Sequence, residues 1–425
     1  MSVRTLKILF IVPGSGDPFY CGNCFRDNQH ANALRKAGHE VAVMPLYLPL
    51  KDPSFLADTP LFFPATSLYL SQKYFKKKSL PRWMEKILQS DFSLSLAASF
   101  SGSTSAGGLE EMTLSMITGD DDVFRRQAHT LVEWIKEHER PDVIHLSSSL
   151  VIGIGKEIKK ATHIPIVCSL QDEEVWIDGL EKEFAEAAWK GIRENMQYVD
   201  CFITSSKFYK NVATSKLHPM QPVHVVYPGL DTAKYASPHY PEHPTIGFFY
   251  RMNELNGLHI LAEAFAKIKR ERRVPHLRLR IGGGFTSVDK PFLRKVDRIL
   301  SPYKHEVDWR HTYSLPEHAA FYKDISAICV PITFEEGVGL YLCEAFAAGR
   351  PAIEPNTGSF AEIVGDAGLL YEPNHSPALA DAIERLFTTN GLWEQCREQA
   401  LHLAETRYNH TTLAEKLHAI YADLL

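Results

Sequence analysis

The sequence predicts an α/β protein with two doubly wound domains, each built on a mostly parallel sheet. Short apolar segments alternate with helical patterns along most of the chain, which is typical of parallel sheets covered by helices on both faces. The chain has 425 residues, whereas single hydrophobic cores stop growing at about 250–300 residues. The alternation is therefore divided between two domains.

The first half contains six segments with the composition of buried strands. The first is followed by a glycine-containing loop and the helical pattern of residues 28–36, which together predict a β-loop-α-β unit. We place the strands at residues 7–12, 41–45, 143–145, 164–170, 201–204 and 224–227. Pro228-Gly229 then predicts a hinge, so the first domain covers residues 1–228.

The second half repeats this architecture, which predicts a second domain over residues 229–408. A helical pattern runs from about residue 258 to 270, and Gly282-Gly283-Gly284 closes one of the strands. The expected strands are residues 245–250, 277–281, 327–331, 351–353 and 368–371.

Residues 51–128 interrupt the alternation in the first domain. They contain many aromatic residues, the run Lys76-Lys77-Lys78, and a Ser/Gly-rich stretch at 99–108. An insertion of this length inside a compact domain is usually a lid, a binding element or a mobile segment, and we expect it to contact an acceptor. Its paired aromatic and cationic residues fit either an anionic lipid surface or a solvated helix face.

Composition excludes some classes of protein. The net charge of −5 argues against nucleic acid as the main partner, because phosphate backbones favour a clustered positive surface. Seven cysteines, an odd number in a long chain, do not indicate a disulfide framework. The apolar runs are shorter than a signal peptide core or a membrane span. We therefore expect a cytoplasmic protein, with peripheral contact to a membrane left open.

The segment from Glu336 to Glu344 has the composition of a ligand-binding loop and helix. Gly337 and Gly339 follow a predicted strand, so a ligand can approach bare backbone, and the helix that begins beside them offers free N–H groups to a phosphate. Glu344, about two turns further along, has a carboxylate that can accept hydrogen bonds from a polyol. We expect nucleotide-sugar contacts at Gly337, Val338, Gly339, Leu340 and Glu344.

This segment resembles the donor site of the family 4 retaining glycosyltransferases, in which Glu, seven residues and Glu enclose Gly-x-Gly. The resemblance covers nearly all of residues 225–425 and, more weakly, residues 5–45 and 140–230. It implies the GT-B arrangement, two Rossmann-like domains facing each other across a cleft. It also implies that Glu336 meets the donor sugar, that Glu344 meets the nucleotide ribose, and that a last helix within residues 409–425 crosses back to the first domain.

The resemblance further implies an activity. Such an enzyme moves a hexose from a nucleoside-diphosphate sugar to a hydroxyl of a glycan, lipid-linked or small-molecule acceptor, with retention of configuration and without a metal. No protein nucleophile is identifiable, in agreement with same-face attack assisted by the leaving phosphate. Arg251, at a strand end, matches the arginine that the family places against the diphosphate.

The chain departs from the family pattern at several positions. Asn256 stands where a second cation is usual, and we keep it as a candidate contact to the donor. Cys21 replaces the first glycine of a pair whose second member, Gly22, can still approach the donor phosphates. Cys21 and Cys24 also form a C-x-x-C pair that suits redox or zinc chemistry, but no second Cys/His pair at zinc spacing accompanies it. We predict no metal site.

The acceptor side is less well defined. Ser147 and Gln171 stand where many relatives have histidines, and the acidic run beginning at Asp172 ends a predicted strand, where open α/β sheets bind ligands. His145 and Asp172 are the candidates for acceptor contacts. Two alternatives stay open: a non-catalytic relative that binds a nucleotide or glycan, and another enzyme on this fold, such as a sugar-nucleotide epimerase or a phosphorylase.

Overall fold

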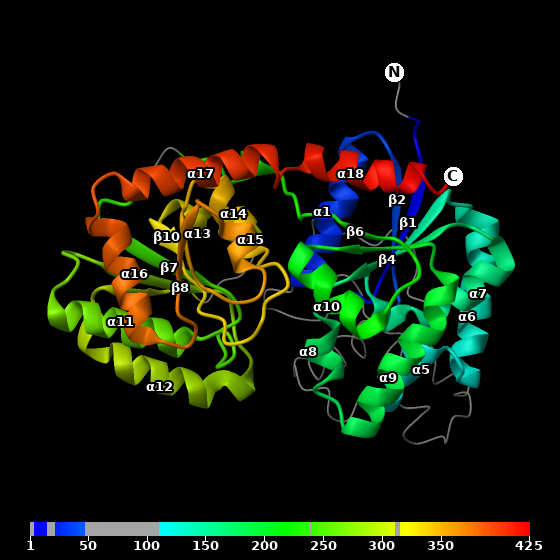
Figure 1. Ribbon diagram of the computed structural model, residues 1–425, viewed down its shortest axis with the longest axis horizontal. Coiled ribbons are helices and arrows are strands. Elements are labelled where there is room, and N and C mark those ends of the chain that lie inside the picture. The colour runs from blue at the N-terminus through cyan, green and yellow to red at the C-terminus, as the bar shows by residue number, and fades with distance from the viewer. Residues whose placement is uncertain (1–3, 15–21, 47–109, 238–239, 311–314) are drawn as a thin grey trace. The chain divides into compact units, whose positions relative to one another are not determined.

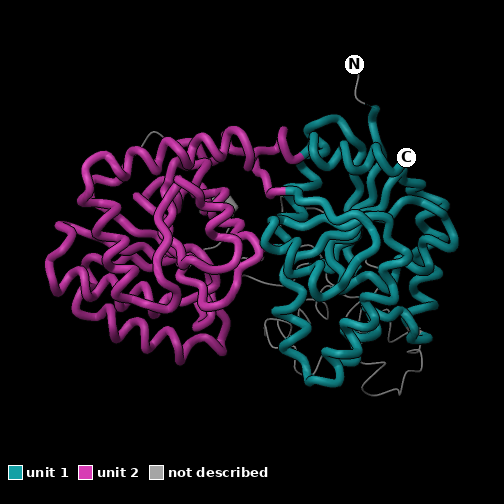
Figure 2. The backbone as a smooth tube through the Cα atoms, in the orientation of Figure 1, with its two compact units in different colours: residues 1–17, 23–226, 414–425 teal, residues 18–22, 227–413 magenta. Residues whose placement is uncertain are grey.

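The computed structural model describes residues 4–14, 22–46, 110–237, 240–310 and 315–425. The chain divides into two compact units, one of residues 1–17, 23–226 and 414–425, the other of residues 18–22 and 227–413 (Figure 2). The domain boundary expected from the sequence lies after residue 228, two residues beyond the break between Val226 and Tyr227.

The first unit contains a parallel sheet of six strands in the order β2-β1-β3-β4-β5-β6, of which β1, β2, β4 and β6 are labelled in Figure 1. This order confirms the predicted doubly wound arrangement, with its reversal between β1 and β3. The strands are β1 (Lys7–Val12), β2 (Glu40–Pro45), β3 (Val143–Leu146), β4 (Ile166–Leu170), β5 (Cys201–Thr204) and β6 (Val223–Val225).

The helices of this unit include part of the predicted insertion. Residues 110–128 form α5 and the start of α6, and α5 packs against α9 and α7; residues 47–109 lie outside the described part of the chain. The helices are α1 (Gly22–Lys36), α5 (Glu110–Thr118), α6 (Asp122–Trp134), α7 (Gly153–Thr162), α8 (Glu173–Ile177), α9 (Lys182–Asn195) and α10 (Lys207–Leu217). Met116, Ile117 and Phe124 are buried in the same apolar cluster as the strands, so α5 and α6 belong to the core of this unit.

The second unit contains another parallel sheet of six strands, in the order β12-β11-β10-β7-β8-β9. Its strands are β7 (Thr245–Phe249), β8 (Arg278–Gly282), β9 (Val307–Trp309), β10 (Ala327–Ile328), β11 (Ala352–Pro355) and β12 (Gly368–Tyr371). The strand order reverses between β7 and β10. Because parallel crossovers are right-handed, the helices on the two sides of this reversal cover opposite faces of the sheet.

Most helices of the second unit pack in two groups. The contacts of α11 are with α12 and α16, whereas α14 packs against α17. The helices are α11 (Leu258–Glu271), α12 (Lys290–Leu300), α13 (Leu315–Lys323), α14 (Tyr341–Ala347), α15 (Phe360–Val364), α16 (Ser376–Thr388) and α17 (Leu392–Thr406).

Two strands differ from expectation. Strand β9 has no apolar run, because Asp308 separates Val307 from Trp309, and the sequence analysis missed it. The predicted strand 327–331 is paired only at Ala327 and Ile328. The amide of Val330 donates to the Glu354 carboxyl instead of to a neighbouring strand, so the chain leaves the sheet there.

The last helix, α18 (His410–Ala422), attaches its C-terminal part to the first unit. The Tyr421 hydroxyl lies 2.6 Å from Nδ1 of His145 on β3, and Nε2 of that histidine lies 2.8 Å from the Ser169 hydroxyl. His145 is fully buried. Its position, with both ring nitrogens hydrogen-bonded inside the unit, favours a structural role over the acceptor contact expected from the sequence.

We expect His145→Gln to flatten the dependence of stability on pH. Burial, together with the Arg26 charge, lowers the pKa of His145 to about 3, whereas an unfolded histidine titrates near pH ~6.5. Below pH ~6.5 this histidine gains a proton only in the unfolded chain, so the free energy of unfolding falls by up to about 2 kcal/mol between pH ~6.5 and ~5. Urea unfolding of the parent and the variant across this range measures the difference.

The exposed His129 on α6 provides the control. His129→Gln should keep the pH dependence of the parent. Equal slopes in the parent and in His145→Gln would contradict the assignment of this titration to His145.

Candidate functional site

The candidate donor site lies at the carboxyl edge of the second sheet, where the strand order reverses. Arg251 follows β7, and the loop that contains Glu336 follows β10, the neighbour of β7 in the sheet. Open α/β sheets bind ligands at such a point. A cavity of about 270 Å³ in the same unit is lined by Thr245, Arg278 and Val307, at the amino ends of β7, β8 and β9, and is therefore at the other edge.

Arg251 is buried, with its side chain 5% exposed. Its guanidinium lies 3.3 Å from both Thr286 Oγ1 and Asp289 Oδ2, and these two residues form a capping box at the start of the 3₁₀ turn Ser287–Asp289. The positive charge of Arg251 is thus already opposed by a carboxylate. A diphosphate at this position would share the guanidinium with Asp289.

Asn256 shapes the loop after β7. Its amide Nδ2 donates to the Arg251 carbonyl at 2.7 Å, and its backbone N–H donates to Asn253 Oδ1 at 2.9 Å. The next residue, Gly257, has φ +72, and a Cβ atom there would lie 1.8 Å from the Pro331 carbonyl oxygen. These contacts favour a structural role for Asn256 over the direct ligand contact expected from the sequence.

The Glu336 loop folds back on itself. Glu336 is 3% exposed, and its Oε1 accepts from the backbone N–H groups of Val338 and Gly339 at 3.4 and 3.3 Å. All residues from Gly337 to Leu340 are buried. The carboxylate of the predicted sugar contact therefore lies against the backbone donors that were predicted to meet the ligand.

Glu344 is a residue of α14, and its carboxylate is surrounded by side chains from other segments. Oε1 accepts from the Tyr235 hydroxyl at 2.7 Å and lies 3.0 Å from Nδ1 of His318, and Oε2 accepts from the Tyr322 hydroxyl at 3.2 Å. The residue is 0% exposed. A ribose hydroxyl that bonds to Glu344 would have to share the carboxylate with these three partners or displace one of them, a constraint that the sequence analysis did not anticipate.

Glu354 on β11 was missed by the sequence analysis. Its carboxyl group is 0% exposed, and the Val330 N–H donates to its two oxygens at 3.3 and 3.4 Å. Burial raises the pKa of Glu354 well above its usual range, and the Glu336 carboxylate raises it further. The available signal was a glutamate directly after the predicted strand 351–353, at the end of a buried apolar segment, where an ionisable residue is rare.

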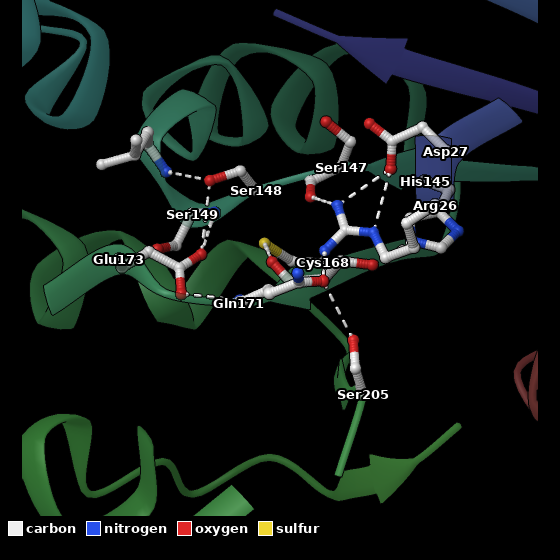
Figure 3. A network of polar contacts seen from close by, with 12 residues as sticks. Arg26, Asp27, His145, Ser147, Ser148, Ser149, Cys168, Gln171, Glu173 and Ser205 are labelled. Atoms are coloured by element: carbon white, nitrogen blue, oxygen red, sulfur yellow. Dashed lines mark hydrogen bonds and ion pairs between the residues drawn. The ribbon is translucent and has the colours of Figure 1, made fainter. Parts of the chain in front are cut away.

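The first unit has a buried polar network at the carboxyl ends of β3, β4 and β5 (Figure 3). The Arg26 guanidinium on α1 pairs with Asp27 at 2.8 Å, donates to Gln171 Oε1 at 2.9 Å, and donates to the Ser147 carbonyl. The same Gln171 oxygen accepts from the Ser205 hydroxyl at 3.1 Å. Arg26, absent from the sequence-based candidates, thus joins one helix to three strand ends.

A second buried group, Glu173, completes this edge. Its carboxylate accepts from the Gln171 N–H at 2.8 Å, the Tyr209 hydroxyl at 2.8 Å and the Ser149 N–H at 3.3 Å. Asp172, the predicted acceptor contact, precedes α8 with φ 57 and is partly exposed. Asp172 therefore lies between two members of the network in the sequence, Gln171 and Glu173, but unlike them is not buried.

Other predicted features are placed only in part. Gly22 is the first residue of α1, six residues before the helix start expected from the sequence; Cys21 and the segment Lys76–Lys78 lie outside the described residues. Across the described ranges, no group of three or more His, Cys, Asp or Glu side chains could hold a metal ion. No described helix is long and apolar enough to cross a membrane.

Two glycosyltransferase family models match the chain. The model described as "Glycosyl transferases group 1" matches residues 243–389, within the second unit. The model described as "Glycosyltransferase Family 4" matches residues 120–234, almost all within the first unit.

Sequence relatives match limited parts of the chain. A probable sucrose-phosphate synthase 2 from Craterostigma plantagineum is 26% identical over 178 residues, which covers 38% of this chain and 16% of the relative. The O-antigen chain mannosyltransferase B of Escherichia coli is 34% identical over 86 residues, covering 16% of this chain and 23% of the relative. The match thus spans about a sixth to a quarter of the length of these relatives.

Solved structures resemble the chain over almost its whole length. A sucrose-phosphate synthase from Thermosynechococcus elongatus has a TM-score of 0.69 at 18% identity and covers 99% of both chains. The Anabaena protein HepE in complex with UDP has a TM-score of 0.68 at 15% identity, covering 98% of this chain and 100% of HepE. With a glycosyltransferase family model on each half and these structural neighbours, the chain has the fold of the GT-B glycosyltransferases.

Proposed function

We propose that this protein is a family 4 glycosyltransferase that moves a hexosyl group from a nucleoside-diphosphate sugar to an acceptor hydroxyl with retention of configuration. The observation that carries the proposal is the segment from Glu336 to Glu344. Its two glutamates and two glycines have the spacing of the family donor site, lie within the matched range 243–389, and follow β10 at the point where the strand order reverses.

The donor class has separate support. A neighbouring solved structure contains UDP-glucose, the HepE complex with a TM-score of 0.65. In our proposal Glu336 faces the sugar, Glu344 faces the ribose, and Arg251 with the backbone N–H groups of residues 337–340 balances the diphosphate without a metal. The acceptor is a glycan, lipid-linked or small-molecule hydroxyl, contacted beside Asp172.

A panel of UDP- and GDP-sugars tests this function. The purified chain is incubated with each donor and chelator, and release of nucleoside diphosphate is measured; the anomeric configuration of the product is then read by NMR. Consumption of one donor with a retained product supports the proposal. An inverted product contradicts retention, and activity only without chelator contradicts metal independence.

A non-catalytic nucleotide-binding relative is the second candidate, and specific contacts favour it. Asp289 opposes the charge of Arg251, Asn256 supplies no second cation, and three protein groups already surround the Glu344 carboxylate. Nucleotide binding in a thermal-shift screen, together with no consumption of any donor, would favour this candidate.

We expect Glu344→Gln to weaken UDP or GDP binding by about 1.5–3 kcal/mol, because a charged acceptor for ribose hydroxyls is lost. Isothermal titration calorimetry measures the affinity. The control is Glu306→Gln, which removes a carboxylate paired with Lys269 at the other edge of the sheet and should leave affinity unchanged. Equal affinity in Glu344→Gln and the parent would show that Glu344 serves only its three protein partners.

Glu336→Gln should affect transfer of the sugar but not binding of the nucleotide. We expect lower donor turnover and nearly unchanged affinity for free UDP or GDP, because Glu336 precedes the helix and is placed against the sugar. Turnover assays and calorimetry on the same preparation measure both. A parallel loss of the two would mean that the roles of the glutamates are misassigned or that the loop has collapsed.

Arg251→Ala should reduce turnover far more than Arg280→Ala. A diphosphate leaving group gains negative charge in the transition state, and loss of one preorganised donor costs about 2.7–4 kcal/mol. Arg280, on β8 next to β7, is the matched control, because its guanidinium also pairs with carboxylates, those of Asp308 and Asp324. If Arg251→Ala retains both binding and turnover, this pocket does not hold a diphosphate.

A further inference from the structure

We propose that Glu354 is the positioning residue of the Glu336 loop. Its carboxyl group lies beside both ends of the loop, and its strand leads into the segment that holds the Glu336 backbone. The inference rests on the proposed function, because that function gives the loop its task of orienting the donor sugar.

The first contact of Glu354 is at the start of the loop. Cys329 still donates its N–H to the Gly247 carbonyl of β7 at 2.9 Å. One residue later, the N–H of Val330 donates to the two Glu354 oxygens at 3.3 and 3.4 Å. A side chain on β11 therefore satisfies the backbone donor at the point where the chain leaves the sheet and turns toward Glu336.

The second contact is at the end of the loop. Tyr341, the first residue of α14, is fully buried. Its hydroxyl lies near the Glu354 carboxyl group, and within the described residues it makes no direct hydrogen bond. The Tyr341 ring packs edge-on against Tyr250 with 5.4 Å between centroids, and Tyr250 directly precedes Arg251. Glu354 is thus linked through Tyr341 to the end of the Glu336 loop and, through the ring contact between Tyr341 and Tyr250, to the residue before Arg251.

The third contact comes from the chain that follows β11. The Ser359 N–H donates to the Glu336 carbonyl at 2.9 Å. Gly358 has φ +55, and a Cβ atom there would lie 2.6 Å from the Glu336 carbonyl oxygen, so the two backbones are in direct contact. Strand β11 and the residues after it therefore hold the loop by its first amide, its last residue and Glu336 itself.

The surroundings of Glu354 favour its neutral form. Burial and the nearby Glu336 carboxylate raise the pKa of Glu354, and the Tyr341 hydroxyl and the Val330 amide, which lower it, do not offset the rise. A neutral acid accepts from one neighbour and donates to another. Glutamine has the same shape and the same two abilities, whereas alanine has neither.

The test compares Glu354→Ala with Glu354→Gln, using UDP-glucose as the donor and UDP as the binding probe. We expect the alanine variant to lower kcat by about 10–100-fold, the effect of a small displacement of a group that orients the substrate, while the affinity for UDP stays within about threefold. The glutamine variant should recover most of the lost kcat.

Ser326→Ala is the matched control. Its hydroxyl is buried and accepts from the Thr245 N–H at 3.0 Å, at the amino edge of the same sheet. This variant should lower the melting temperature without a selective loss of kcat. If Glu354→Ala does not fold, Tyr341→Phe is measured instead and should lower kcat with UDP affinity retained.

The proposal is overturned if Glu354→Gln is as inactive as Glu354→Ala, or if Glu354→Ala is as active as the parent. Where Glu354→Ala does not fold, it is overturned if Tyr341→Phe folds and has the kcat of the parent. A parent that consumes no nucleotide sugar contradicts the proposed function instead. Hydrogen exchange at the Val338 and Gly339 amides then tests the positioning role: Glu354→Ala must accelerate it and Glu354→Gln must not.

Discussion

The reversal of strand order between β7 and β10 is the constraint on which the candidate donor site depends. All strands of the second sheet are parallel, so their carboxyl ends share one edge, and the two connections that leave in opposite directions open a gap above neighbouring strands. The Arg251 loop and the Glu336 loop begin on the two sides of that reversal. Residues separated by some 85 positions in the chain are therefore placed at one edge by topology alone.

The polar side chains at this edge of the second sheet are buried, so each of them needs a hydrogen-bond partner. An unpaired polar group inside a protein costs free energy, and the carboxylates here meet that requirement differently. Glu344 receives two tyrosine hydroxyls and lies beside a histidine, whereas burial raises the pKa of Glu354 so that it can remain neutral. Glu336 accepts from two backbone amides of its own loop at 3.4 and 3.3 Å, which are longer contacts than those of Glu344.

The first unit applies the same principle with charges of both signs. Arg26 and Glu173 are each nearly inaccessible, and each collects donors or acceptors from adjacent strand ends (Figure 3). Arg26 and Glu173 both bond to Gln171, so the network joins neighbouring strand ends, and Asp172 between Gln171 and Glu173 is partly exposed.

The sequence by itself determined the class of fold, most strand positions and the segment of the chain that carries the donor motif, because buried parallel strands and glycine loops leave local patterns. It did not reveal β9, whose strand has no apolar run, or Arg26 and Glu354, whose importance comes from partners distant in the chain. Only the tertiary structure decided that His145 is buried between Tyr421 and Ser169, that Asn256 supports a loop, and that Glu344 is already surrounded. Composition and spacing report on the residue itself, whereas burial and hydrogen-bond partners depend on which distant segments the fold brings together.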